Sequence, residues 1–75
     1  MVERDAEGNA IFDLNRSKKV IVKKFKGQVI VDIRETFEKD GKTLFTKKGV
    51  GMTHDTWEKF KSLIPIIDKE VLHAR

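Results

Sequence analysis

Hydrophobic and polar residues alternate with a period of two along residues 18–34, a pattern typical of β-strands. A two-residue turn at Lys26-Gly27 would fold this segment into a hairpin with Phe25 opposite Gln28. One face of that hairpin carries mainly β-branched residues: Val20, Val22, Val29, Val31 and Ile33, with Lys24 near the turn. The other, called the open face below, carries Lys19, Ile21, Lys23, Phe25, Gln28, Ile30, Asp32 and Arg34. The β-branched face is expected to pack in the core, which leaves the open face for solvent or a partner.

The same alternation and the turn residues around it predict further strands. Four strands are expected in all, over residues 10–14, 18–25, 28–37 and 43–46. Asp40-Gly41 is a strong turn signal between the last two. Residues 1–10 are polar and are expected to form a flexible lead-in, so a single domain would span residues 11–75.

The C-terminal third of the chain has the period of an amphipathic helix. Its apolar residues recur at spacings of three and four: Trp57, Phe60, Ile64, Ile67 and Val71. Thr53 is a suitable N-cap before this run. Leu63 and Ile66 make the apolar stripe wider than one face of a small sheet needs, so either a second copy of the chain covers the surplus or both residues pack at the sheet edge. We favour the homodimer and expect its interface at Trp57, Phe60, Leu63, Ile64 and Ile67.

Pro65 lies inside this helical stripe, where proline removes an amide donor and clashes with the preceding turn. The expected result is a kink near residues 61–64 or two helical pieces, and the unbroken spacing of the stripe favours one kinked helix. The order of elements predicts an α+β fold. A curved four-stranded antiparallel sheet would be followed by one C-terminal helix that covers one face and leaves the other free.

Charged residues of one sign cluster along the chain. The net charge of +4, from 16 Lys+Arg and 12 Asp+Glu, does not show this clustering. Residues 15–31 contain no acid and six cations: Arg16, Lys18, Lys19, Lys23, Lys24 and Lys26. A second basic cluster comprises Lys39, Lys42, Lys47 and Lys48. Such clusters can be no more than a solvated surface, but a basic sheet face with an exposed aromatic suits unpaired nucleic acid, whose phosphates and bases both find partners there.

Several classes of function are not supported by the sequence. The chain has no cysteine, and His54 and His73 are too few and too far apart for a zinc site. No serine has a histidine at an informative spacing, and Gly49-Val50-Gly51 lacks the spacing of a phosphate-binding loop. No apolar run approaches the roughly 20 residues of a membrane span. We expect a soluble, intracellular protein that is not an enzyme and uses no metal or cofactor.

Four stretches of the chain resemble the positive cofactor four family of transcriptional coactivators: Phe25-Lys26-Gly27, residues 29–35, Lys47-Lys48-Gly49 and Trp57. The similarity runs from about Ile11 to Val71. The family shares a single-stranded-DNA-binding domain, so the resemblance implies a dimer that holds two antiparallel single strands, or melted duplex, in two grooves. It also implies a nuclear protein that contacts transcription activators and the general transcription machinery.

The resemblance further implies a set of nucleic-acid contacts. Phe25 matches the base-stacking aromatic of the family, while Lys26 and Arg34 match its phosphate and base contacts. Phe37 matches a second stacking aromatic, although strict alternation sends it to the core side unless a bulge or strong twist intervenes near Glu35-Thr36. The remaining expected contacts are basic or polar: Arg16, Lys18, Lys23, Gln28, Lys47 and Lys48.

Three questions stay open at this stage. Phe45 replaces part of a stretch that usually contains Pro-Gly, so it either packs into the vacant space, the interpretation we favour, or stacks on a base. Asp32 either orients Arg34 or Lys19 through a charge-assisted hydrogen bond or is only a partner of a neighbouring cation. The ligand itself is open, since RNA and an acidic protein partner are both alternatives to single-stranded DNA.

Overall fold

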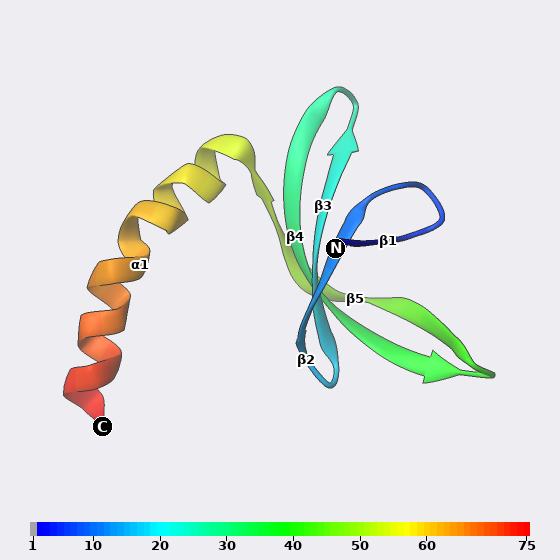
Figure 1. The fold of residues 1–75 in the computed structure, drawn as a ribbon. Helices are drawn as coiled ribbons and strands as arrows, with labels where there is room; N and C mark the ends of the chain where they lie inside the picture. The colour runs from blue at the N-terminus through cyan, green and yellow to red at the C-terminus, as the bar shows by residue number, and fades with distance from the viewer. Residues whose placement is uncertain (1) are drawn as a thin grey trace.

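The computed structural model describes residues 2–75 and shows one antiparallel sheet followed by one long helix (Figure 1). Each strand is hydrogen-bonded to its neighbours in the chain, in the order β1-β2-β3-β4-β5. The elements are β1 (Glu3–Arg4), β2 (Ala10–Asn15), β3 (Lys18–Phe25), β4 (Gln28–Lys39), β5 (Lys42–Thr53) and α1 (His54–Ala74). This confirms the α+β class and the antiparallel sheet with a single C-terminal helix, but the sheet has five strands where four were expected.

The additional strand β1 lies in the segment that was expected to be a flexible lead-in. Its Glu3 pairs with Ile11 of β2, and the intervening turn is organised by the side chain of Asp5. Oδ1 of Asp5 accepts hydrogen bonds from the backbone N–H groups of Glu7 (2.9 Å) and Asn9 (2.8 Å). The Asn9 amide and the other donors of the turn lower the pKa of Asp5. A polar turn is thus held by its own hydrogen bonds and not by an apolar face.

The β3–β4 hairpin has the register expected from the sequence, with Phe25 opposite Gln28 and Ile21 opposite Asp32. Lys26 and Gly27 both have positive φ, 52° and 79°, as a type I′ hairpin turn requires. Asp40 and Gly41 repeat this arrangement between β4 and β5. Both turns match the right-handed twist of the strands that they join, which is why a two-residue connection suffices.

Strand β5 is longer than expected, because it continues through residues 47–53, beyond the strand that was predicted over residues 43–46. The pairing of β4 with β5 is irregular between Arg34 and Thr36: Arg34 lies opposite Gly49, whereas Thr36 lies opposite Phe45. The extra residues are therefore on β5, and side chains continue to alternate along β4. Phe37 pairs with Leu44 on the side opposite to Arg34, where its side chain is half-exposed.

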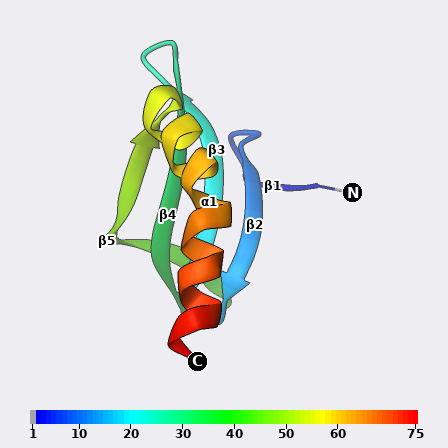
Figure 2. The same ribbon diagram turned by 90° about the vertical axis from the view of Figure 1, so that its left-hand side faces the viewer.

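Helix α1 is one continuous helix through Pro65, and its axis curves in Figure 1. Thr53 is its N-cap, with Oγ1 accepting a hydrogen bond from the Thr56 N–H. Among the strands of residues 2–75, the helix contacts only β4 and β5, and none of the helix residues is buried. It was expected to cover one sheet face. Figure 2 shows it in front of the sheet, but Figure 1 shows that it stands away from the strands after its initial contact. A hollow lined by Ile33, Met52 and Phe60 separates the two.

Candidate nucleic-acid interface

The open face lies on the side of the sheet away from α1, because the helix meets the alternate residues Ile33, Val50 and Met52. Phe25 is the most exposed aromatic on the open face, with 60% of its surface accessible. The Lys26 ammonium lies 5.4 Å from the centre of the Phe25 ring, within range of a cation–π contact. The tip of the hairpin therefore presents a flat ring and a positive charge side by side.

A buried carboxylate organises the middle of the open face. Asp32 is only 2% exposed, and its two oxygens accept hydrogen bonds from Arg34 Nη2 (2.9 Å) and Nε (3.2 Å). The Lys23 ammonium is 3.4 Å from Asp32 Oδ2. The sequence offered Arg34 and Lys19 as cations that Asp32 could orient, and in the structure Asp32 is hydrogen-bonded to Arg34. Lys19 is instead bonded to Asp13, which raises the pKa of Lys19.

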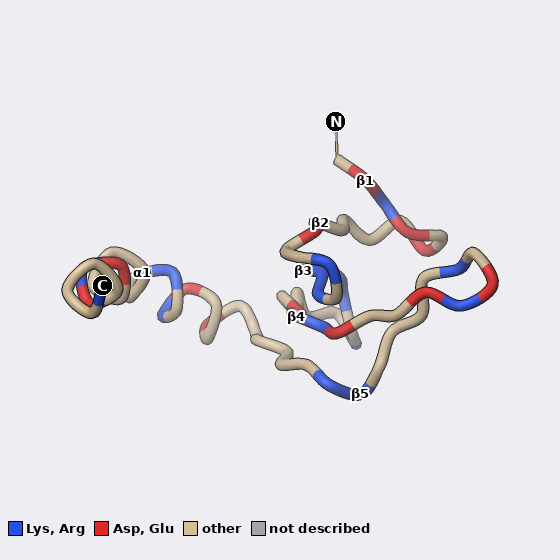
Figure 3. Tube along the Cα trace, turned by 90° about the horizontal axis from the view of Figure 1, so that it is seen from below, with Lys and Arg blue, Asp and Glu red and all other residues tan. Residues whose placement is uncertain are grey.

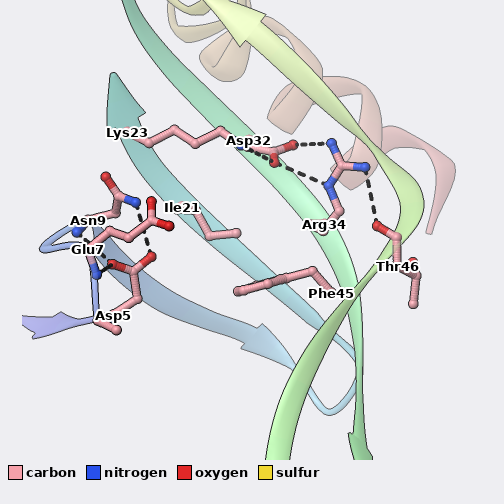
Figure 4. Close-up of a pocket in the computed structure, with 10 residues that line it drawn as sticks. Asp5, Glu7, Asn9, Ile21, Lys23, Asp32, Arg34, Phe45 and Thr46 are labelled. Atoms are coloured by element: carbon pink, nitrogen blue, oxygen red, sulfur yellow. Dashed lines mark hydrogen bonds and ion pairs between the residues drawn. The ribbon is translucent and has the colours of Figure 1, made fainter. Parts of the chain in front are cut away.

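Arg34 also binds the backbone of β5, so its guanidinium joins Asp32 of β4 to β5. These contacts of Arg34 are called the clamp below. Its Nη1 group donates to the carbonyl oxygen of Thr46 (3.4 Å), as Figure 4 shows, and to that of Lys47 (3.2 Å). A guanidinium has five N–H donors, and these four contacts leave at most one for another partner. The main visible role of Arg34 is thus to hold the bend of β5 that carries Lys47 and Lys48.

Gly49 makes this clamp sterically possible. A Cβ atom at this position would lie 2.6 Å from the carbonyl oxygen of Ile33 and 2.8 Å from Nε of Arg34. Both distances are shorter than any ordinary non-bonded contact, so the backbone of β5 approaches β4 closely only because residue 49 has no side chain.

A hollow of about 410 Å³ opens beside the clamp, between the β1–β2 turn and the bend of β5 (Figure 4). Ile21 and Lys23 contribute to it from β3, Phe45 from β5, and Glu7 from the turn. Phe45 is 47% exposed, so the packing role that we favoured leaves half of its surface accessible.

The expected contact residues occupy several parts of the molecule. Lys23, Phe25, Gln28 and Arg34 share the open face. Lys47 and Lys48 lie at the bend of β5, where Figure 3 shows positive residues separate from those of β3. Arg16 and Lys18 lie at the far end of β3 from Phe25, and Lys18 is opposite Glu35 on the helix side. Phe37 is also on the helix side, which places it away from Phe25.

Residues 5–9 reach the open face although sequence reasoning had placed them outside the domain. The sequence does contain a signal for this turn, Asp5 followed by Gly8-Asn9, because Asp, Gly and Asn favour side-chain-capped turns.

Within residues 2–75, no group of three or more His, Cys, Asp or Glu side chains could hold a metal ion. Over the same residues, no helix has the length and apolar character that a membrane crossing needs.

Comparison with known proteins identifies the family. The family described as Transcriptional Coactivator p15 (PC4) matches residues 12–63. The RNA polymerase II transcriptional coactivator KELP of Arabidopsis thaliana is 40% identical over 70 residues, covering 92% of this chain and 42% of that protein. A putative RNA polymerase II transcriptional coactivator of Caenorhabditis elegans is 35% identical over 69 residues, covering 89% of this chain and 56% of that protein.

The chain thus spans about half the length of these relatives. A crystal structure of a MoSub1–ssDNA complex matches with a TM-score of 0.89 and 33% identity, covering 97% of this chain and 88% of that chain. The fold, the family match and the two relatives agree with one another and with the resemblance noted from the sequence. The chain belongs to the PC4 family of transcriptional coactivators.

Proposed function

We propose that this chain binds single-stranded or melted DNA on its open face and acts as a general transcriptional coactivator in the nucleus. The observation that carries the proposal is the exposed ring of Phe25 beside Lys26, on a sheet face that also carries Lys23 and Arg34. The MoSub1–ssDNA complex supports it, because that protein has the same fold. Contacts with transcription activators and the general machinery belong to the same proposal.

Two physical terms would combine in binding. The exposed lysines release counterions from the phosphates, so affinity falls as salt rises. Phe25 stacks on an unpaired base and tolerates any sequence, because every base has a π-face. Lys47 and Lys48 would extend the phosphate track beyond the sheet centre, on a bend that Arg34 holds in place. Phe37 would stack only on a strand that passes around to the helix side of β4.

Replacing Phe25 with Leu is expected to weaken binding to a single-stranded oligonucleotide by about fivefold or more, since stacking contributes roughly 1–3 kcal/mol per base. Fluorescence anisotropy at two salt concentrations, with the same sequence as single strand and as duplex, measures this. The affinity of Phe25→Leu for the duplex is the control, because paired bases are not free to stack on the ring. Equal affinity for single strand and duplex would reduce the open face to a non-specific cationic surface.

We also propose that the functional form is a homodimer. The single chain exposes 6456 Å², whereas a compact monomer of 8.7 kDa exposes about 4,700 Å². Its radius of gyration is 14.3 Å, against about 11 Å for a compact chain of 75 residues. The surplus of roughly 1,700 Å² per chain is the size that an obligate dimer buries. The exposed apolar side chains available to cover one another include Phe12, Val29, Val50, Ile64, Ile67 and Val71.

The interface residues expected from the sequence form two groups on α1, and a dimer could bury both. Phe60 and Leu63 line the hollow between α1 and the sheet, and the Trp57 ring lies 6.2 Å from that of Phe60. Ile64 and Ile67 are exposed one turn further along the helix. A second copy that entered the hollow would cover both groups at once.

Sedimentation equilibrium is expected to give twice the 8.7 kDa chain mass for the wild-type protein. Ile67→Glu should shift the equilibrium to monomer and lower the melting temperature, because it places a charge in the apolar stripe. Lys69→Glu is the matched control, since the same residue type is introduced on the opposite side of α1. A wild-type mass of one chain across the concentration range would contradict the dimer.

A further inference from the structure

The hollow beside Phe45 has the features of a pocket for a flat, polar-edged ring. Its floor is Ile21, which is 5% exposed, and its wall is the half-exposed ring of Phe45. The volume of about 410 Å³ lies within the range of small-ligand pockets. Proteins that hold an extruded base use this combination of an aromatic or apolar surface and a polar rim.

Glu7 supplies an acceptor and Lys23 a partly exposed donor at the polar rim. The Glu7 carboxylate extends toward Ile21 in Figure 4 and has no hydrogen-bond or ion-pair partner among residues 2–75. The other two carboxylates at the hollow are already occupied: Asp5 by the amides of its own turn, and Asp32 by Arg34. Lys23 lies on the same wall as Asp32, with a side chain 38% exposed. Glu7 is therefore the carboxylate with capacity for a ligand.

We propose that this hollow takes one unpaired base of the bound strand and selects bases that carry an exocyclic amino group over thymine. The inference rests on the proposed function. The ring of the base stacks on Phe45, while the amino group donates to the Glu7 carboxylate. Thymine presents the O4 acceptor where cytosine presents the N4 donor, so its edge opposes the carboxylate.

The arrangement of charge separates the base from the backbone. A carboxylate beside a phosphate is repulsive, so Glu7 keeps phosphates out of the hollow and on the lysines of β3 and β5. The turn that carries Glu7 is held by three hydrogen bonds to the Asp5 side chain, so the backbone at Glu7 is in place before the strand arrives, while its carboxylate is free to turn toward a base. Stacking of a base on Phe25 involves neither Phe45 nor Glu7, so the Phe25 ring and the hollow can be tested separately.

Equal-length dC and dT oligonucleotides provide the test, because the two bases have the same ring size and differ at the polar edge. The wild-type 75-residue chain is expected to bind dC several-fold more tightly than dT in an anisotropy titration. Glu7→Gln should bring the dC/dT ratio close to one, since an amide can donate to thymine O4 or accept from cytosine N4. Glu70→Gln removes the same charge from the exposed part of α1 and should leave the ratio unchanged.

Phe45→Leu is expected to weaken binding to both oligonucleotides by about fivefold or more through lost stacking. If Glu7→Gln instead strengthens dC and dT binding equally, the acidic turn only screens the basic face and the pocket assignment is wrong. If wild-type protein binds and Phe25→Leu weakens it, but Phe45→Leu and Glu7→Gln change neither affinity nor ratio, the pocket fails while the proposed function stands. If wild-type protein binds no single strand at low salt, both fail.

Discussion

Asp32→Asn is expected to lower the free energy of unfolding by about 2–4 kcal/mol. Asn keeps the size of Asp32 but removes the charge that Arg34 and Lys23 share. Two neighbouring cations then lose their common partner, and the new side-chain NH2 group competes with the Arg34 donors. Breaking a buried pair in this way typically costs about 3–5 kcal/mol, and the partial exposure of both cations moderates the loss.

Urea unfolding at one fixed protein concentration measures the change, because a dimer's stability depends on concentration. Asp13→Asn is the matched control. Asp13 also pairs with a lysine, Lys19, but its side chain is 72% exposed, so the same chemical change should cost less than about 1 kcal/mol. If the two variants unfold at the same urea concentration, Asp32 does not organise the open face as described.

The central hairpin could be predicted from the sequence because its information is local. Alternation of β-branched and polar residues sets the two faces, and a turn with positive φ at Lys26 and Gly27 sets the register. Together these place Phe25 beside Gln28 and Asp32 two residues before Arg34 on one face. The partnership of Asp32 with Arg34 follows from that spacing, since alternate residues of a strand lie on the same side.

The other parts of the fold depend on contacts that alternation does not encode, some of them local hydrogen bonds and some between distant residues. β1 was missed because the turn before β2 depends on the Asp5 side chain and has no apolar period. The second half of β5 was not predicted as a strand because Lys47 to Gly51 is rich in glycine and charge, yet Arg34 and Gly49 hold it against β4. The apolar period located α1 but could not show that the helix leaves its own sheet largely uncovered.

Gly49→Ala is expected to cost about 1–3 kcal/mol of stability, the range for forcing an extra methyl group into a packed site. The new Cβ would meet the Ile33 carbonyl oxygen at 2.6 Å, and a backbone atom cannot move aside as a flexible side chain can. The bend that carries Lys47 and Lys48 should shift away from β4 and strain the contacts of the Arg34 guanidinium. Affinity for single-stranded DNA should therefore fall together with stability.

Gly51→Ala separates this steric effect from the general consequence of removing a glycine. The two glycines are two residues apart on β5, but a Cβ at Gly51 would lie 3.7 Å from Ile30 Cγ2, an ordinary contact. Gly51→Ala should thus be neutral or slightly stabilising in the same urea titration. Because Gly49→Ala and Asp32→Asn disturb one clamp, the double variant should lose less stability than the two single losses together. Additive losses would mean that the close approach at Gly49 and the Arg34–Asp32 pair act independently.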